Sequence, residues 1–155
     1  MSKTNAMRIL DKEKVDYEVL SYEAKDGLID GISVASKIEK DVKEVYKTLV
    51  GQGKEQVYVF IIPVDQELDL KKAAEVTNEK KVELIHVRDI QKLTGYIRGG
   101  CSPIGMKKLY PSFIQNDSLD LEKIIISAGK IGLQIQISPK DLAERIQGIF
   151  VDIIK

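Results

Sequence analysis

The apolar and polar positions of the chain follow helical spacing in some stretches and strand spacing in others. Residues 4–14 carry apolar side chains at helical spacing, and Thr4 is expected to cap this helix. The run YEVLSY at residues 17–22 indicates a strand. Turn residues then predict a loop over residues 26–31, after which Ser33 is expected to cap a short helix. The N-terminal part therefore mixes short helices with short strands.

The middle of the chain predicts a β-hairpin. After a helical turn at residues 42–45, residues 47–53 (KTLVGQG) indicate a short strand that ends in a glycine-rich turn. Residues 56–62 return as a second strand, which is almost continuously apolar and β-branched. Such a run is typical of a central strand that is buried on both faces.

The C-terminal half predicts further short elements around one irregular segment. Between Gly99 and Gly105, the run GGCSPIG contains glycines and a Ser-Pro pair that oppose both helix and sheet, so a loop is expected. The alternating glutamines of residues 132–138 predict a strand with one solvent-facing side. The other expected elements are helices at 70–76 and 88–93, strands at 82–84, 111–114, 124–127 and 150–153, and a helix capped by Ser138 with Pro139 at its first position.

These elements indicate one fold class. Many short strands joined by hairpins, with helices between them, favour an α+β protein with a mixed, largely antiparallel sheet or barrel over a doubly wound sheet. The chain shows no repeat, low-complexity stretch or shift in composition. A single domain over residues 1–155 is therefore expected.

Composition and charge narrow the function classes. Lys plus Arg and Asp plus Glu both number 24, so RNA contact would have to depend on local basic patches. The single cysteine excludes an intramolecular disulfide, and the N-terminus lacks the apolar core of a secretion signal. No apolar stretch approaches the ~20 residues of a membrane helix. We expect a cytoplasmic protein without a membrane segment.

Several common catalytic sites are disfavoured. His86 is the only histidine, and its place after a short strand is more simply that of a strand end than of a Ser-His-Asp triad member. One histidine and one cysteine cannot supply a standard zinc site, so neither a metal nor a cofactor is expected. The GQG turn resembles the start of a dinucleotide fingerprint, but no glycine follows at the required spacing.

Two features remain as candidates for chemistry. Lys47 begins a strand, from which its ammonium could enter a cleft, although position alone favours an exposed surface lysine. The loop GGCSPIG could aim backbone N–H groups at an oxyanion or a phosphate, or it could be a structural hinge. Cys101 lies in this loop, but a small residue beside two glycines need not be a nucleophile.

Three segments in register resemble the YbaK/EbsC family. They are KTLV at Lys47 to Val50, TGYIRGGCSPIGMKK at Thr94 to Lys108, and SAGKIGLQIQISPKDL at Ser127 to Leu142. The resemblance covers nearly the whole chain. It implies a six-stranded barrel-like sheet surrounded by helices, and an aminoacyl-tRNA deacylase related to the editing domain of bacterial prolyl-tRNA synthetase. The YbaK branch removes cysteine from proline tRNA, so the resemblance implies Cys-tRNA(Pro), with Cys-tRNA(Cys) as a further substrate.

The resemblance also implies a set of site residues. Lys47 matches the family's key lysine, and the amides of Gly100 and Cys101 are the expected oxyanion donors. The implied substrate-binding residues are Tyr22, Ile29, Asp30, Gly99, Ser102, Pro103, Ser127 and Gln134. Basic residues on and after the loop, Arg98, Lys107 and Lys108, are the expected RNA contacts. Mischarged tRNA and prolyl-tRNA synthetase are the implied partners.

The expected mechanism needs no protein nucleophile. The thiol of a cysteinyl substrate can attack its own ester and leave as a cyclic thiolactone, which agrees with the lack of a convincing triad or metal set. Two alternatives stay open at this point. One is a deacylase for alanine or another small amino acid that uses water, and the other is a non-catalytic module that binds tRNA or a nucleotide.

Overall fold

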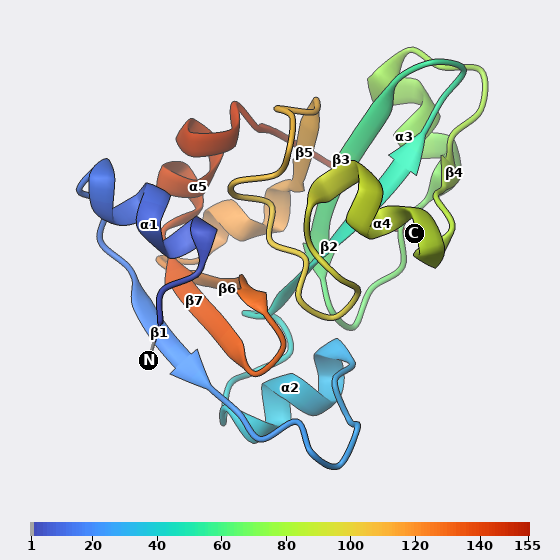
Figure 1. Ribbon diagram of the computed structural model, residues 1–155. Helices are drawn as coiled ribbons and strands as arrows, with labels where there is room; N and C mark the ends of the chain where they lie inside the picture. Colours follow the sequence, from blue (N-terminus) through green and yellow to red (C-terminus); the bar gives the residue numbers. More distant parts are fainter. Residues whose placement is uncertain (1) are drawn as a thin grey trace.

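A computed structural model describes residues 2–155 as two β-sheets with helices around them (Figure 1). The smaller sheet has the strand order β1-β7-β6, and both of its strand pairs are antiparallel. Its strands are β1 (Glu18–Ser21), β6 (Ile124–Lys130) and β7 (Leu133–Ile137). This sheet joins two segments that lie more than 100 residues apart in the sequence.

The larger sheet has the order β4-β2-β3-β5-β8 and mixes both strand directions. β2 pairs with β3 and with β4 in antiparallel fashion, whereas β3–β5 and β5–β8 are parallel. The predicted mixed, largely antiparallel arrangement is therefore confirmed. The strands are β2 (Tyr46–Gln52), β3 (Val57–Pro63), β4 (Glu83–Leu84), β5 (Ser112–Gln115) and β8 (Ile149–Val151).

The structure differs from the expected six-stranded, barrel-like sheet. Within residues 2–155 the eight strands form two open sheets, with β4 and β8 at the edges of the larger one. One parallel bridge, between Val45 and Ile125, links the segment before β2 to β6 of the smaller sheet. Closure requires a continuous hydrogen-bonded ladder, which a single bridge does not supply. This junction nevertheless brings the start of β2 beside β6.

Local capping explains where three of the helices begin. Thr4 Oγ1 accepts from the Met7 amide and starts α1 (Asn5–Lys12), and Ser138 caps α5 (Pro139–Ile146), both as predicted. α2 (Gly31–Lys37) begins earlier than expected. Its cap is Asp30, which accepts from the Ser33 amide at 3.1 Å, so the expectation of a Ser33 cap was wrong.

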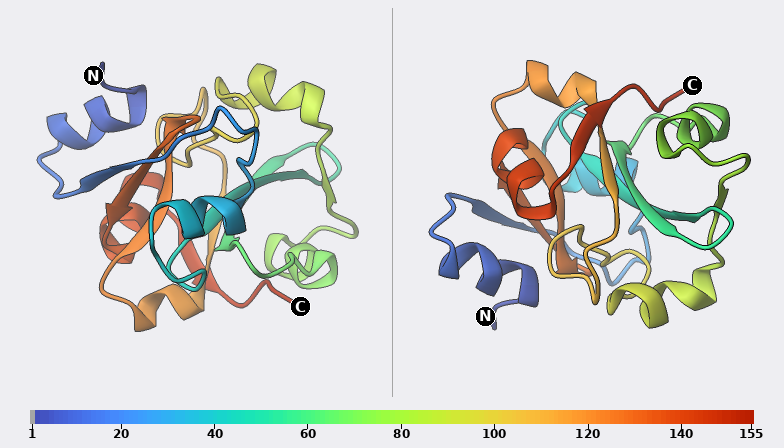
Figure 2. Two further views of the ribbon diagram at one scale, coloured as in Figure 1. Left: turned by 90° about the horizontal axis from the view of Figure 1, so that it is seen from below. Right: turned by 90° about the horizontal axis from the view of Figure 1, so that it is seen from above.

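The other helices flank the larger sheet. α3 (Leu70–Thr77) and α4 (Val87–Thr94) lie on opposite sides of the β2–β3 hairpin (Figures 1 and 2). The 3₁₀ helix η1 (Asn116–Asp120) follows β5 and was not predicted. No helix in the described part of the chain is long and apolar enough to cross a membrane.

β3 contributes to the core on both of its faces, as its apolar run predicted. Val59 and Ile61 pack with residues of α1, β6, β7 and α5. Phe60 and Ile62 face the other way, toward α3, and the Phe60 ring stacks on Phe113 at a centroid distance of 5.8 Å. Burial on both faces fixes β3 as the centre of the fold.

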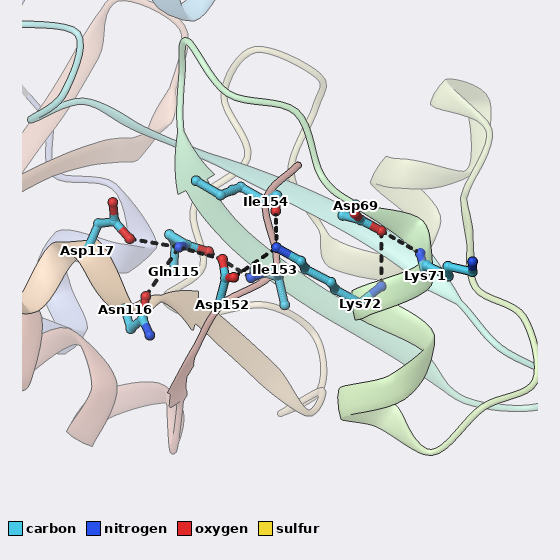
Figure 3. Close-up of polar contacts among 9 residues, drawn as sticks. All are labelled: Asp69, Lys71, Lys72, Gln115, Asn116, Asp117, Asp152, Ile153 and Ile154. Atoms are coloured by element: carbon cyan, nitrogen blue, oxygen red, sulfur yellow. Dashed lines mark hydrogen bonds and ion pairs between the residues drawn. The ribbon is translucent and has the colours of Figure 1, made fainter.

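A polar network around the buried Gln115 side chain ties the C-terminus to the larger sheet (Figure 3). The Gln115 side chain is 1% exposed, and its Nε2 donates to Asp117 Oδ1 at 2.8 Å and to Asp152 Oδ1 at 3.0 Å. Its Oε1 accepts from the Ile153 amide at 2.8 Å. Lys72 of α3 donates to the other oxygen of Asp152 at 2.8 Å. This Gln115 network satisfies its own polar groups and serves the structure.

Candidate active site

A cavity of about 220 Å³ opens at the junction of the two sheets. Its walls come from the start of β2, the end of β3, the beginning of α2, the loop after α4, and strands β6 and β7. Lys47 lies in this cavity together with part of the glycine-rich loop. Segments far apart in the sequence therefore build one concave site, which we call the Lys47 cavity.

The Lys47 ammonium is half-buried and has spare donor capacity. Its Nζ lies 3.5 Å from the Val64 carbonyl oxygen, which is a long contact for a charged donor. Burial lowers the pKa of Lys47, and the carboxylates of Glu67 and Asp65 offset part of this effect. A partly desolvated ammonium acts more strongly on a nearby negative charge than an exposed one does. Lys47 is suited to bind an anionic or developing anionic group.

Two neutral polar side chains of the cavity wall have no protein partner. The Thr48 hydroxyl is buried without a hydrogen bond among the described residues. The Gln134 side chain is only 6% exposed, and its amide makes no hydrogen bond to any residue from 2 to 155. Buried polar groups are normally paired, because leaving one unpaired costs about 1–3 kcal/mol. This cost applies to the Thr48 hydroxyl, while the Gln134 amide borders the cavity, so both groups are free to hydrogen bond to a molecule in it.

The burial of Gln134 differs from the prediction. The alternating pattern placed this side of β7 in solvent, but the cavity walls cover Gln134, which is paired in register with Ser127 on β6. Ser127 lines the same cavity, and its Oγ accepts from the Gly129 amide at 3.1 Å. The cavity thus has a polar floor formed by β6 and β7.

Gly99 and Ile29 lie next to each other at the wall of the cavity. Gly99 has φ of +83°, and a Cβ there would lie 2.8 Å from Ile29 Cδ1. A side chain at position 99 would therefore be strained and would collide with the apolar wall. The glycine allows the loop to close against the segment before α2.

The Gly100 amide cannot serve as the oxyanion donor that was expected. It donates to the Ile97 carbonyl oxygen at 3.0 Å within the loop. A Cβ on this residue would lie 3.0 Å from the Ile131 amide nitrogen, so Gly100 lets the loop pack against the β6–β7 turn. The next amide, of Cys101, has no acceptor within residues 2–155. Of the two expected amide donors, only that of Cys101 has no acceptor among the described residues, and only Cys101 lines the cavity.

The Cys101 side chain is poorly suited to nucleophilic attack. Burial raises the pKa of its thiol to about 11, and the hydrogen bond to Thr94 Oγ1, at 3.9 Å, offsets this only in part. The thiolate is the reactive form, and little of it exists at neutral pH with such a pKa. This agrees with the expectation that Cys101 contributes its backbone and not its sulfur.

Four of the expected substrate-binding residues lie outside the cavity wall. Asp30 caps α2, and its hydrogen bonds to Ser33 lower the pKa of its carboxyl group. Ser102 is fully buried and its Oγ accepts from the Ile104 amide, while Pro103 lines a different cavity. Tyr22 does not line the Lys47 cavity, although its hydroxyl is buried without a partner among the described residues. The structure therefore does not place these four residues at the wall of the Lys47 cavity.

The basic residues divide into two groups. Arg98 is exposed and lines the Lys47 cavity. Lys107 and Lys108 do not line it: Lys107 Nζ donates to the Lys92 carbonyl oxygen at 3.1 Å, and Lys108 borders the separate cavity beside Pro103. Of these three residues, only Arg98 lines the Lys47 cavity.

Residues that sequence reasoning missed complete the wall. Val34, Val45 and Val64 supply apolar surface, and Thr48 supplies the buried hydroxyl. Gly31 is needed because a Cβ there would lie 2.3 Å from Val64 Cγ1. The signal for Thr48 was its polarity beside Lys47 in an apolar strand. The valines gave no signal because they look like ordinary core residues.

The described residues contain no cluster of three or more His, Cys, Asp or Glu side chains that could hold a metal ion. His86 is exposed at the start of α4 and lies away from the cavity wall. The chemistry available at the site is therefore that of an ammonium, a guanidinium, a free amide N–H and neutral polar groups.

Comparison with known proteins places this geometry in a family. The model of the aminoacyl-tRNA editing domain matches residues 31–144. A protein of Enterococcus faecalis, provisionally named Cys-tRNA(Pro)/Cys-tRNA(Cys) deacylase EbsC, is 42% identical over 152 residues, which cover 97% of this chain and 93% of the relative. These matches confirm the YbaK/EbsC resemblance.

Solved structures confirm the fold. A structure provisionally described as a trans-editing enzyme for prolyl-tRNA synthetase has a TM-score of 0.86 and 21% identity, and it covers 100% of this chain and 99% of its own. A hypothetical protein has a TM-score of 0.89 and 20% identity over 98% of this chain and 100% of its own. The family match, the close relative and the cavity around Lys47 lead to one conclusion: the chain belongs to the aminoacyl-tRNA editing domain family and is an aminoacyl-tRNA deacylase that acts on mischarged tRNA.

Proposed function

We propose that the protein removes cysteine from proline tRNA, with Cys-tRNA(Cys) as a further substrate. The name of the Enterococcus relative supports this substrate class. The observation that carries the proposal is the Lys47 cavity itself, in which an ammonium and unpaired neutral polar groups surround a small space without a reactive protein nucleophile. Such a site suits a substrate that brings its own nucleophile.

The size of the cavity favours a small aminoacyl group. Its volume of about 220 Å³ is below the ~300–1,000 Å³ of ordinary small-molecule sites. Apolar surface from Val34 and Val64 lies opposite the polar floor of β6 and β7. A side chain of one methylene and a sulfur atom fits such a mixed wall.

The proposed chemistry is an intramolecular acyl transfer. The substrate thiol loses its proton, and its sulfur attacks the ester carbonyl carbon to form a carbon–sulfur bond. The tetrahedral intermediate then expels the terminal ribose oxygen, which takes up a proton, and a cyclic thiolactone leaves. Holding the two groups in a reactive geometry supplies much of the rate, because well-oriented intramolecular reactions have very high effective molarities.

The chain's residues orient the substrate and stabilise negative charge. The Lys47 ammonium lies where it can bind the thiolate or the developing oxyanion, and the free Cys101 amide can donate to the oxyanion. Gln134, Thr48 and Ser127 bind the aminoacyl group or the terminal adenosine through their polar atoms. Of these neutral groups, the Thr48 hydroxyl and the Gln134 amide have no partner among the described residues, and the Ser127 hydroxyl oxygen accepts only from the Gly129 amide.

The decisive experiment compares charged tRNAs in parallel. Deacylation of proline tRNA that carries cysteine, alanine, serine or S-methylcysteine is measured at equal enzyme concentration. The proposal requires rapid release of cysteine and little release of the other three, because only cysteine has a free thiol. Equal release of S-methylcysteine and cysteine would favour the alternative in which water attacks small aminoacyl esters.

The proposed protein partner has a test of its own. The zero net charge suggests that tRNA identity is read with help, and we propose prolyl-tRNA synthetase as the partner. Co-sedimentation of the protein with the synthetase and proline tRNA should show a ternary complex.

The cytoplasmic location of the protein stays a prediction. The alternative of a non-catalytic module is set aside by the membership of the deacylase family.

A further inference from the structure

Positive charge is concentrated in one segment of this neutral protein. Residues 87–110 contain five of the 24 basic side chains but only one of the 24 acidic ones. The five are Arg88 and Lys92 on α4, and Arg98, Lys107 and Lys108 on the loop that follows. All five residues are exposed, and none forms an ion pair with a residue in the range 2–155. We call this set the α4 surface.

Contacts in the structure join the members of the α4 surface. Arg88 and Lys92 lie one helical turn apart, so they share one face of α4. Lys107 Nζ donates to the Lys92 carbonyl oxygen at 3.1 Å, which places the two lysines side by side at the end of the helix. Arg98 extends the surface to the wall of the Lys47 cavity. Figure 1 shows α4 and this loop on the same side of the β2–β3 hairpin.

The stability of α4 does not account for its basic residues. Lys92 and Lys107 lie at the C-terminal end of the helix, where positive charge offsets the helix dipole. Arg88 lies in the first turn of α4, where the helix dipole makes a cation unfavourable. It also lies four residues before Lys92, and two like charges at this spacing repel each other on the helix surface. Both local costs would be offset by a polyanion that lies along the helix.

We propose that the α4 surface binds the phosphate backbone of the tRNA acceptor stem while the charged 3′ end occupies the Lys47 cavity. This inference rests on the proposed function. Arg88 and Lys92 are assigned to the duplex, because they lie on α4 and do not line the cavity. Arg98, at the cavity wall, contacts the single-stranded end. A phosphate-binding surface of this kind gives affinity without reading sequence.

The test neutralises α4 alone. Arg88→Gln/Lys92→Gln is compared with Lys123→Gln/Lys140→Gln, which removes two exposed, unpaired lysines outside the α4 surface. Binding of uncharged proline tRNA is followed by fluorescence anisotropy at several salt concentrations. The α4 variant should bind about tenfold more weakly, and its log–log salt slope should fall by about 0.7–0.9 for each phosphate that the protein no longer neutralises. The control should match the wild type.

A short substrate separates this inference from the proposed function. The trinucleotide CCA esterified with cysteine lacks the duplex, so the α4 variant should cleave it at the wild-type rate while its KM for full-length Cys-tRNA(Pro) rises. Wild-type binding and salt slope in the α4 variant would overturn the inference, as would equal reductions of activity on both substrates. Failure of the wild type to release cysteine from either substrate would refute the proposed function instead, and the anisotropy data would still decide the role of α4.

Discussion

Two buried glutamines of this protein have opposite surroundings. Gln115 is 1% exposed and hydrogen bonds to two aspartates and to the Ile153 amide. Gln134 is 6% exposed and has no hydrogen-bond partner among the described residues. The first glutamine joins the C-terminus to the larger sheet, and the second lines the Lys47 cavity. The same side chain is paired within the protein at one position and left without a protein partner beside a cavity at the other.

The difference shows how a binding site can be recognised before any ligand is seen. A polar group that is fully paired inside the protein strengthens the fold, whereas an unpaired one lowers stability by about 1–3 kcal/mol. An unpaired polar group that borders a cavity is free to hydrogen bond to a molecule bound there. Gln134 and Thr48 meet this description, and the Gln115 network does not. Substitutions in the two regions should therefore affect different properties.

The largest effect should come from Lys47 in the cavity. We expect Lys47→Met to lower kcat/KM for Cys-tRNA(Pro) at least about 100-fold, comparable to the loss of one oxyanion donor elsewhere. The free energy of unfolding should stay the same or rise at neutral pH, because a partly desolvated ammonium is removed. Lys43→Met, at an exposed lysine outside the cavity, is the matched control. Wild-type deacylation by Lys47→Met would contradict the proposed roles.

The second-largest effect should be a loss of stability when the Gln115 network is disrupted. Gln115→Leu leaves the Asp152 carboxylate and the Ile153 amide with fewer partners inside the protein. We expect the free energy of unfolding to fall by about 2–4 kcal/mol in urea denaturation, with kcat/KM per folded molecule unchanged. A stability within about 0.5 kcal/mol of the wild type would mean that the network contributes little.

The same substitution at the other glutamine should give the reverse pattern. Gln134→Leu removes an amide without protein partners, so stability should be unchanged or slightly higher. We expect about a tenfold loss of kcat/KM for Cys-tRNA(Pro), about the effect of one neutral hydrogen bond to the substrate. Steady-state kinetics and urea denaturation of both leucine variants, measured together, test the comparison directly. A destabilised Gln134→Leu with normal kcat/KM would reverse the assignment of the two regions.

The pH dependence of deacylation should report the charge of Lys47. Because burial lowers its pKa below the ordinary 10.5, the ammonium is present below that lowered value and is lost as the pH rises through it. The enzymatic rate, after subtraction of spontaneous hydrolysis, should therefore fall several-fold on the alkaline side before pH 10.5. Lys47→Arg keeps its charge throughout this range, so any activity it retains should lack this decline. An identical alkaline limb in both proteins would assign the titration to another group.

The smallest effect is expected at Cys101. Its thiol has a pKa raised to about 11 by burial, so it is protonated at neutral pH. Cys101→Ala preserves the backbone amide and should keep kcat/KM within about twofold of the wild type. The wild-type thiol should also react slowly with iodoacetamide at pH 8. Loss of activity in Cys101→Ala, with an unchanged melting temperature, would assign the sulfur a direct role.

Much of the fold could be predicted because its signals are local. Thr4 and Ser138 cap helices through hydrogen bonds to amides only three residues away. The GQG turn gives its hairpin, and the apolar run of β3 gives a strand buried on both faces. Of the expected site residues, Lys47, Gly99, Ser127 and Gln134 line one cavity in the structure. The α2 cap was missed because Asp30 and Ser33 are both suitable caps, and packing against Val64 selects the earlier start at Gly31.

The sequence by itself determined most of the short elements, the family and the candidate site residues, since these depend on spacing and residue type. Only the tertiary structure decided that the sheets stay open, that the Gly100 amide is used within its own loop, and that Gln134 is buried without a partner. These properties depend on which distant segments meet. A strand's alternation shows which side chains share a face, but it does not show what covers that face.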